Sequence, residues 1–176
     1  AAQVGIPLYV KAVAGGVVIR VDSYEALPDA VKRARERAAI VTGERAVYLE
    51  RAVDHLRQVA TTIVADHHGE VAWLGHSDKS LQVGFRSWAE EMGVDIVGAE
   101  LHQRMGQAAA ALTRQMEWVG IGRVRWAVTP NGGWYLLGFS GRLTTGYSLA
   151  ERVFGVDLVR TQRRLALGDH LAWDHA

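Results

Sequence analysis

Histidines and carboxylates are the residue types in this chain that could bind a metal. The chain has 7 histidines; His67 and His68 are adjacent, and His170 lies near Asp174 and His175. Imidazole and carboxylate groups are common ligands of divalent metals. Neighbouring side chains in a strand or turn point in different directions, so they cannot readily chelate one ion. We therefore interpret His67-His68 as a surface turn and expect no metal site at either place.

Other catalytic motifs are missing from the sequence. It contains no nucleophile elbow, no phosphate-loop motif with a lysine, and no paired zinc-ligand spacing. Because there are 0 cysteines, disulfides, thiolate metal sites and cysteine nucleophiles are excluded. The lack of cysteine also favours a reducing compartment, so we expect a cytoplasmic protein.

The charge balance gives no sign of a polyanionic partner. Lysine and arginine number 20 against 19 acidic residues, a net charge of +1. A nucleic-acid or anionic-membrane partner would favour a strongly basic surface, so neither is expected. No apolar run approaches the ~20 residues of a membrane-spanning helix. With 49% hydrophobic residues the chain can bury a sizeable core.

The elements of the first half predict a hairpin, a helix and further strands. Leu8 to Val13 and Val17 to Val21 are apolar and β-branched around Gly15-Gly16, which we interpret as turn glycines. Helical spacing follows from Ser23 to Arg37. Three strands are then expected at 46–50, 59–65 and 70–74.

The second half predicts helices on either side of another hairpin. We expect a short helix at Phe85 to Met92 and a longer one at Gly98 to Val119. Strands at 123–128 and 133–139 flank a Thr-Pro-Asn-Gly turn, and Leu149 to Leu167 is the expected final helix. Helices and antiparallel strands in successive blocks predict an α+β protein with two lobes.

This order of elements and several short sequence motifs resemble the ATP-grasp core of the biotin carboxylases. Val4 to Ala12 resembles that family's "IGYPVIIKA" strand, and Ala46 to Arg51 resembles its "VYMEKY" hinge. Asp78 to Gln82 resembles "DCSMQ", and 155–159 resembles "GVDLI". The resemblance implies an ATP-grasp core with antiparallel sheets and packed helices, divided into a glycine-loop lobe at 1–80 and a second lobe at 81–176. It covers neither a preceding nucleotide-fold lobe nor a C-terminal region, so we expect the core alone.

The same resemblance implies an ATP-driven, magnesium-dependent carboxylation of biotin, but its acidic residues are replaced. The family's first magnesium ligand falls at Arg125 or Trp126, and its second falls within Gly138-Phe139-Ser140. None of these residues carries a carboxylate. Phosphoryl transfer depends on the metal to neutralise phosphate charge. We therefore expect no bound magnesium and weak ATP binding at most.

The acid/base element of the family is also reduced. Its "TRIQVEH" element corresponds to 141–147, where only Arg142 is retained and Thr145-Gly146 offers no titratable group. Arg142 is therefore the one residual catalytic candidate. We also expect the Trp126 indole to fill the vacated metal and phosphate space. The remaining tryptophans, 73, 88, 118, 134 and 173, are expected mainly in the core.

Some residues of the family's nucleotide-binding site have counterparts in this sequence. Lys11 takes the place of the family's phosphate-contacting lysine, although an exposed strand lysine is as often only solvated. The adenine hinge corresponds to Glu50, Arg51 and Val53, and Gln82 ends the "DCSMQ"-like stretch. These residues are our cofactor-binding candidates.

The functional prediction is a degenerate ATP-grasp domain that serves as a structural or interaction module. The expected partners are other carboxylase components, namely a biotin carboxylase, a biotin carrier or a carboxyltransferase, and further copies of the chain. Two alternatives stay open. One is an active ATP-dependent carboxylase or ligase that recruits metal ligands such as Glu151 or Asp157. The other is a nucleotide-binding module without turnover.

Overall fold

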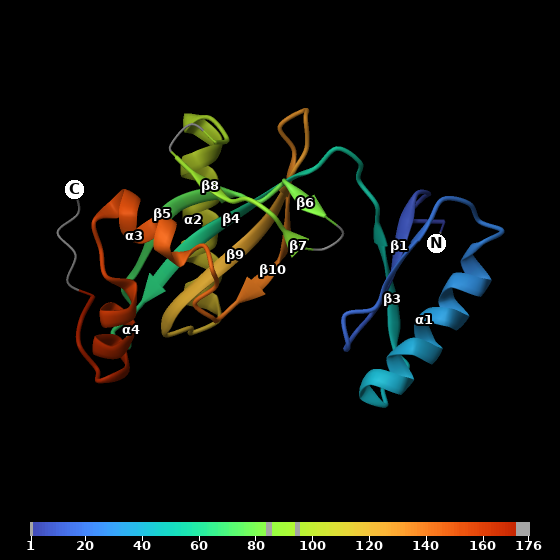
Figure 1. Ribbon diagram of the computed structural model, residues 1–176, viewed down its shortest axis with the longest axis horizontal. Helices are drawn as coiled ribbons and strands as arrows, with labels where there is room; N and C mark the ends of the chain where they lie inside the picture. Colours follow the sequence, from blue (N-terminus) through green and yellow to red (C-terminus); the bar gives the residue numbers. More distant parts are fainter. Residues whose placement is uncertain (1, 84–85, 94–95, 172–176) are drawn as a thin grey trace. The chain divides into compact units, whose positions relative to one another are not determined.

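The computed structural model describes residues 2–83, 86–93 and 96–171. The chain divides into two compact units, Ala1–His55 and Leu56–Ala176. Antiparallel sheets and four helices make up the described part, as expected of an α+β ATP-grasp fold (Figure 1). No helix in that part is long and apolar enough to cross a membrane.

The first unit is a three-stranded antiparallel sheet covered by one helix. The strands β1 (Leu8–Ala12), β2 (Val18–Val21) and β3 (Val47–Arg51) are ordered β2-β1-β3. Helix α1 (Leu27–Thr42) has Pro28 in its first turn, where the missing N–H costs no hydrogen bond. Leu8 and Val10 alternate inward from β1 and pack with Ala30 and Ala34 of α1.

The second unit is built on a five-stranded antiparallel sheet ordered β10-β9-β4-β5-β8. Its strands and the short β6–β7 hairpin are β4 (Arg57–Ala65), β5 (Val71–Asp78), β6 (Gln82–Val83), β7 (Arg86–Ser87), β8 (Glu91–Met92), β9 (Gly120–Val128) and β10 (Trp134–Ser140). The helices are α2 (Ala99–Gln115), α3 (Tyr147–Phe154) and α4 (Leu158–Ala166).

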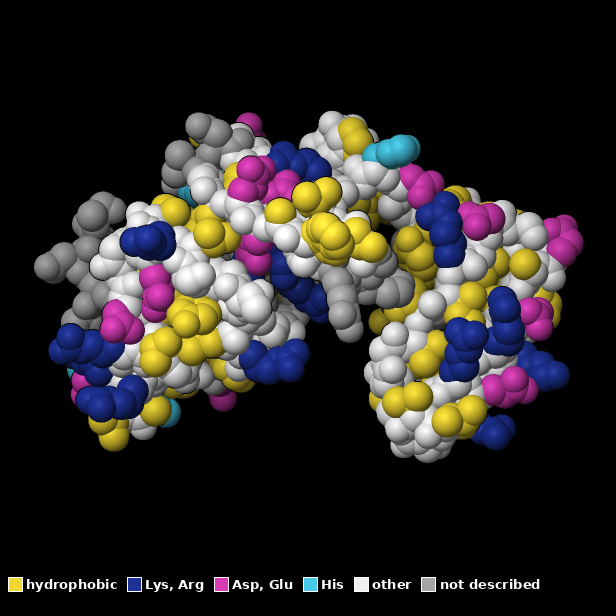
Figure 2. All heavy atoms as spheres, viewed as in Figure 1, with side chains coloured by type: hydrophobic (Ala, Val, Ile, Leu, Met, Phe, Trp, Pro, Cys, Tyr) yellow, Lys and Arg dark blue, Asp and Glu magenta, His cyan; other side chains and the backbone are white. Residues whose placement is uncertain are grey.

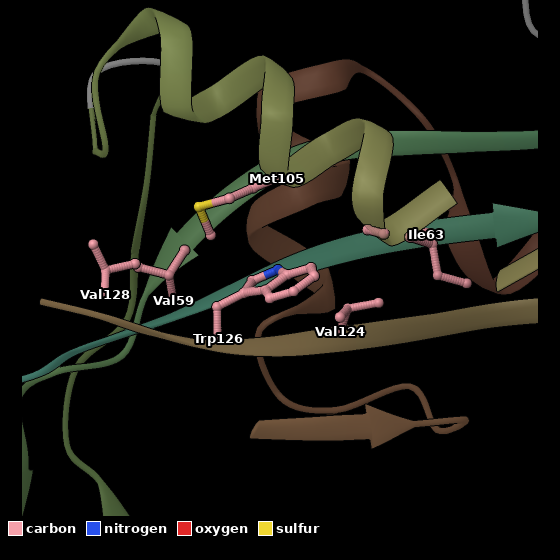
Figure 3. Close-up of a cluster of buried hydrophobic side chains, with 7 residues drawn as sticks. Val59, Ile63, Met105, Val124, Trp126 and Val128 are labelled. Carbon is pink, nitrogen blue, oxygen red and sulfur yellow. The ribbon is translucent and has the colours of Figure 1, made fainter. Parts of the chain in front are cut away.

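The two faces of this sheet are covered by different helices. Val59, Val124 and Trp126 lie beneath Met105 of α2 in one hydrophobic cluster (Figure 3). On the other face, Ile121 packs with Leu158 and other residues of the α3–α4 region. The alternation of β9 therefore assigns its even-numbered residues after 122 to α2 and its odd-numbered residues to the opposite face.

The boundary between the units lies at His55, whereas the sequence suggested a division at residue 80. The reason is strand pairing. Strand β4 pairs with β9 over nine residue pairs, from Arg57↔Val128 to Ala65↔Gly120, and β5 pairs with β4. These ladders connect β4 and β5 to the second sheet, so both strands belong to the second unit.

Two predicted helices differ from the structure. Residue 85 lies outside the described residues, but Arg86–Ser87 and Glu91–Met92 of the expected helix at 85–92 are short strands, paired with β6 and β5. The expected final helix is two helices. Helix α3 ends at Gly155, which has a left-handed backbone (φ 66°), and α4 begins after Asp157, whose side chain accepts from the Arg160 N–H.

Trp126 does not fill the space predicted for it. Its indole lies on the α2 face of β9, is 4% exposed, and packs among the cluster residues in Figure 3. The indole Nε1 donates a 2.8 Å hydrogen bond to Thr61 Oγ1. The prediction was wrong because the side-chain alternation of β9 directs residue 126 into the core. Trp88, by contrast, is 75% exposed rather than in the core, and Trp173 lies outside the described residues.

Candidate basic site in the second unit

A cavity of about 270 Å³ opens on the face of the second sheet opposite α2. Strand β9 directs Arg123 and Arg125 to this face because Val124 and Trp126 are buried beneath α2. The basic residues Lys79 and Arg142 complete the cationic wall. The other lining residues are Ala60, Phe139, Ser140 and Thr144. The lining therefore contains four cationic side chains and no carboxylate.

Arg123 is the buried member of this group. It is 3% exposed, and its guanidinium pairs with Glu90, contacts Ser77 Oγ, and donates a 2.9 Å hydrogen bond to Thr144 Oγ1. Burial opposes ionisation of Glu90, but the hydrogen bonds from Arg123 and Ser77 outweigh it and hold the pKa of this carboxyl below its usual value. Glu90 is therefore a fixed anion committed to Arg123.

The remaining cations have no such counterion. Among the residues that the structure describes, neither Lys79, Arg125 nor Arg142 forms an ion pair. Burial lowers the pKa of Lys79; attraction by Glu90 opposes this shift, while repulsion from Arg123 and Arg125 adds to it. The cavity therefore gathers like charges that repel one another. On the face shown in Figure 2, basic and acidic side chains are interspersed over much of the surface.

Arg125 lies directly over a glycine of the neighbouring strand. Gly138 is its cross-strand partner in the β9–β10 ladder, after a register shift between Leu136 and Gly138. A Cβ at position 138 would lie 3.0 Å from Arg125 Nη2, and the backbone φ of 151° is one that favours glycine. The Arg125 guanidinium therefore lies in space that a side chain at position 138 would need.

Comparisons with known proteins establish the family of this chain. The family of the carbamoyl-phosphate synthase L chain, ATP binding domain, matches residues 1–173. The chain belongs to this family. It is a biotin carboxylase-type ATP-grasp domain.

Relatives and solved structures agree with this family. Biotin carboxylase 2 of Bacillus subtilis (strain 168) is 32% identical over 176 residues, covering 98% of this chain and 40% of that protein. The chain thus spans about two fifths of the length of this relative. The biotin carboxylase–beta-gamma-ATP complex of Campylobacter jejuni has the same fold, with a TM-score of 0.93 at 23% identity over 98% of this chain and 39% of that one.

A second solved structure is the biotin carboxylase domain dimer of the 2-oxoglutarate carboxylase of Hydrogenobacter thermophilus, in complex with MgADP, ADP and bicarbonate. Its TM-score is 0.92 at 22% identity, over 98% of this chain and 39% of that one. At this identity the likeness concerns the fold alone. Relatives of this ATP-grasp domain are thus domains of larger carboxylases.

Magnesium, which the family implies, does not fit the residues of this cavity. Mg²⁺ is bound through carboxylate and phosphate oxygens, and the lining has none of its own. Within residues 2–83, 86–93 and 96–171 there is no group of three or more His, Asp or Glu side chains that could hold a metal ion. The resemblance places the acidic ligands at Arg125 or Trp126 and within Gly138-Phe139-Ser140, and none of these residues carries a carboxylate.

The two acidic residues proposed as substitute ligands have other roles. Glu151 Oε1 accepts a 2.8 Å hydrogen bond from the Leu158 N–H, and Asp157 Oδ1 accepts a 2.7 Å bond from the Arg160 N–H. Both carboxylates thus satisfy free N–H groups at the start of α4, where negative charge is favoured. Neither residue lines the basic cavity.

Glu90 occupies the space beside Gly146, a residue of the stretch that corresponds to the family's acid/base element. A Cβ at Gly146 would lie 2.3 Å from Glu90 Oε1, so the Glu90 carboxylate packs directly against this glycine. A larger residue at 146 would force Glu90 to move. The carboxylate packed against Gly146 is therefore the one paired with Arg123, and its lowered pKa makes it a poor proton acceptor.

The predicted site residues fall into two groups, one in each unit. In the second unit Arg142 lines the basic cavity, while Gln82 lines an adjoining cavity of about 90 Å³ that shares Lys79 and Arg125 with it. Gln82 Nε2 donates to Gln58 Oε1 at 2.8 Å and to the Lys79 carbonyl at 3.0 Å. The structure therefore brings Gln82 and Arg142 to neighbouring cavities.

The hinge residues of the first unit are largely engaged with one another. Lys11 Nζ lies 2.5 Å from Glu50 Oε1, so the predicted phosphate lysine and the predicted adenine acceptor form an ion pair. Arg51 Nε donates to the Val4 carbonyl at 3.0 Å, and Val53 is half-buried after β3. Their roles toward a nucleotide remain predictions.

The sequence reasoning did not identify Lys79, Arg123 and Arg125 as one cluster. A signal was present in 123–126, where two arginines alternate with apolar residues, because this period places both on one face of a strand. Finding Lys79 in the same cluster also required the pairing of β4 with β5 and β9, which crosses the chain.

In the part of the chain that the structure describes, the histidines belong to no group that could hold a metal ion. His68 and His170 stack with their ring centroids 3.6 Å apart, and His68 Nε2 lies 3.1 Å from the Gly168 carbonyl oxygen. His67 is an exposed turn residue, whereas Asp174 and His175 lie outside the described residues. These contacts connect the β4–β5 turn to the segment after α4.

Proposed function

We propose that this carboxylase-family ATP-grasp domain does not perform magnesium-dependent carboxylation. The observation that carries the proposal is the Arg125–Gly138 pair. The resemblance places acidic magnesium ligands at Arg125 or Trp126 and within Gly138-Phe139-Ser140, yet Arg125 is a cation and its cross-strand partner Gly138 has no side chain. Metal-assisted phosphoryl transfer requires the ion to bridge and neutralise phosphate oxygens. A guanidinium beside that position would repel the ion.

The proton-transfer residues give a second reason. A general base must have a free lone pair within reach of its proton and a pKa suited to accept it. Position 146 is glycine, and the Glu90 carboxylate packed against it is already bound to Arg123 and Ser77. Its lowered pKa further weakens it as a base. The acid/base step implied by the resemblance thus has no fitted residue.

We infer that the domain serves as a structural or interaction module of a carboxylase assembly. The expected partners are biotin carboxylase, biotin carrier or carboxyltransferase components, and a second copy of the chain. The domain dimer in the Hydrogenobacter structure supports the last of these. A cytoplasmic location, expected from the lack of cysteine, belongs to the same proposal.

A nucleotide-binding role without turnover is the second candidate. It is favoured by the uncompensated cations Lys79, Arg125 and Arg142, since a purely structural domain gains nothing from gathering like charges. An active enzyme is less well supported, because Glu151 and Asp157 are committed to the N-terminus of α4.

The experiment is an assay of phosphate release from ATP, with bicarbonate and biotin added separately, across a range of magnesium concentrations. We expect no bicarbonate- or biotin-dependent rate above a blank without protein. The intact B. subtilis relative is the positive control, and circular dichroism confirms that the chain is folded. Magnesium-dependent turnover that rises with both bicarbonate and biotin would contradict the proposal.

A further inference from the structure

The outer face of helix α4 carries arginines together with exposed apolar side chains. This surface, called the α4 face, consists of five exposed residues, Val159, Arg160, Arg163, Arg164 and Leu167. We propose that the α4 face is a docking site for a short acidic segment of a partner protein, which also has apolar side chains that contact Val159 and Leu167. The inference rests on the proposed function as an interaction module, and it adds the location of the interface and the chemistry of the partner.

The spacing of these residues places them on one side of the helix. Val159, Arg163 and Leu167 follow one another at intervals of four residues, and Arg160 and Arg164 form a second row beside them. In Figure 2, dark blue side chains gather over α4, at the lower left of the view. The α4 face therefore has an apolar residue at each end and arginines between them.

The inner side of α4 fixes the orientation of this face. Leu158 and Leu165 are buried and pack with Ile121 of β9. Gln162 Oε1 accepts a 2.9 Å hydrogen bond from the Ile121 N–H, and the Asp157 side chain caps the N-terminus of the helix. A partner therefore meets a backbone that is already ordered, and binding has to order only the side chains of the α4 face.

The charge of the face selects the chemistry of the partner. Helix α4 contains three arginines and no carboxylate. Arg164 pairs with Asp169 at 2.8 Å, whereas Arg160 and Arg163 take part in no ion pair within the described residues. Guanidinium groups bind carboxylates through paired N–H donors. An acidic segment would therefore supply the counterions that Arg160 and Arg163 lack.

Helix stability explains only part of this composition. Arg163 and Arg164 lie in the last turn, where positive charge interacts favourably with the helix dipole. The same dipole disfavours Arg160 near the N-terminus, and it gives no reason for Val159 and Leu167, which are 53% and 74% exposed. The methylene stem of Arg163 lies between these two residues in the row and extends the apolar surface. Apolar side chains that form one patch with a polar rim are typical of an interaction site.

The size of the α4 face favours a short segment over a folded partner. The 9 residues of α4 span about 14 Å, whereas a stable protein interface takes about 20–30 residues from each side. A second copy of the chain is a poor occupant of this face, because a symmetric contact would place the same arginines opposite one another. An anionic membrane is a poor occupant too, since the face has few large apolar side chains to insert.

The test measures binding of a fluorescent model peptide to the full chain by fluorescence anisotropy. The peptide has glutamates and leucines at helical spacing and no basic residue. We expect a Kd on the order of 100 μM, because few contacts are formed, and weaker binding in added salt, because these contacts are exposed. The same peptide with glutamine in place of glutamate should not bind, and its binding as tightly as the acidic peptide would overturn the inference.

Matched substitutions locate the binding site on the chain. Arg160→Gln together with Arg163→Gln should weaken binding by about tenfold through the loss of two exposed charge pairs. Lys32→Gln together with Arg35→Gln is the control, because these residues have the same spacing on the exposed surface of α1. Leu167→Ala should weaken binding by about threefold through lost apolar contact. Glutamine and alanine are good helix formers, and circular dichroism confirms that each variant is folded.

Several results would overturn the inference. Lack of binding at millimolar peptide, unchanged binding in the α4 double variant, or an equal loss in the α1 control would each do so. Tighter binding to phosphatidylserine vesicles than to the peptide, lost in the α4 double variant, would assign the face to a membrane surface instead. A dimer in sedimentation that the same variant abolishes would assign it to a second copy.

These failures are distinct from failure of the proposed function. Bicarbonate- and biotin-dependent turnover would contradict the proposed function whatever the peptide binding shows. Lack of peptide binding by a folded chain without turnover would overturn only the docking site on α4.

Discussion

Arg125 and Gly138 are cross-strand partners in the β9–β10 ladder, and the Arg125 guanidinium lies 3.0 Å from where a Cβ at position 138 would begin. The two residues therefore depend on one another. A side chain at 138 would displace the arginine, and the guanidinium charge would repel a metal ion from the same space. This relationship links the composition of the cavity to the chemistry that the domain can support.

This coupling can be measured by a double-mutant cycle. Gly138→Ala should lower the free energy of unfolding by about 1–2 kcal/mol, because the new Cβ meets Arg125 and the backbone φ favours glycine. In an Arg125→Ala background the cost should fall by about 0.5 kcal/mol or more, since the steric contact is gone. Urea unfolding of the four proteins provides the measurement. Strictly additive effects would show that the two residues are independent.

The Arg123–Glu90 pair predicts a large effect of removing one buried charge. Side-chain exposures of 4% and 10% place both groups away from water. Glu90→Ala should destabilise the domain by about 3–5 kcal/mol, because the Arg123 charge stays buried without a partner. Glu100→Ala, which breaks the exposed Glu100–Arg104 pair, should cost less than about 1 kcal/mol. Similar losses in the two variants would argue against a structural role for the buried pair.

A buried histidine makes stability depend on pH. His76 is 0% exposed; its Nε2 donates to the His102 carbonyl at 2.9 Å, and its Nδ1 accepts from Thr61 Oγ1 at 2.8 Å. This arrangement holds the neutral ring. Burial, with repulsion from His102, lowers the pKa of His76 to about 4, although the hydrogen bond to the His102 backbone opposes the shift.

The sign of the effect follows from this lowered pKa. Below about 6.5 the unfolded chain takes up a proton at His76 that the folded chain does not accept until about pH 4, so stability is lost as the pH falls. Between pH 7 and pH 5 the loss should be about 2 kcal/mol. Urea unfolding at both values measures it, with His76→Gln as a control that flattens the dependence. If His76→Gln keeps the wild-type pH dependence, another group is responsible.

Much of the fold could be predicted from local sequence. The β1–β2 hairpin, α1 and the β9–β10 hairpin follow from turn residues and periodicity near one another in the chain. The break between α3 and α4 was not predicted, although Gly155 and Asp157 are typical residues at helix ends. The boundary at His55 depends on β4 pairing with β9, a contact between residues about 60 positions apart that local patterns do not contain.

Less of the candidate site than of the fold could be predicted from the sequence. Arg142 and Gln82 were identified through the family resemblance, and the structure brings them to adjoining cavities. The cluster that joins them is made by Lys79, which follows β5, and by Arg123 and Arg125 of β9. The Trp126 hypothesis failed because adjacent positions of β9 face opposite sides of the sheet, so residue 125 lines the cavity while residue 126 enters the core.

The most direct test concerns the divalent cation itself. Manganese(II) has the same preference for oxygen ligands as magnesium and can be followed by electron paramagnetic resonance. We expect the spectrum of manganese(II) without nucleotide to be unchanged by the protein, because the cavity provides no carboxylate for the ion. A protein-dependent spectrum would show that the protein itself binds the ion and would contradict the proposed loss of magnesium-dependent chemistry.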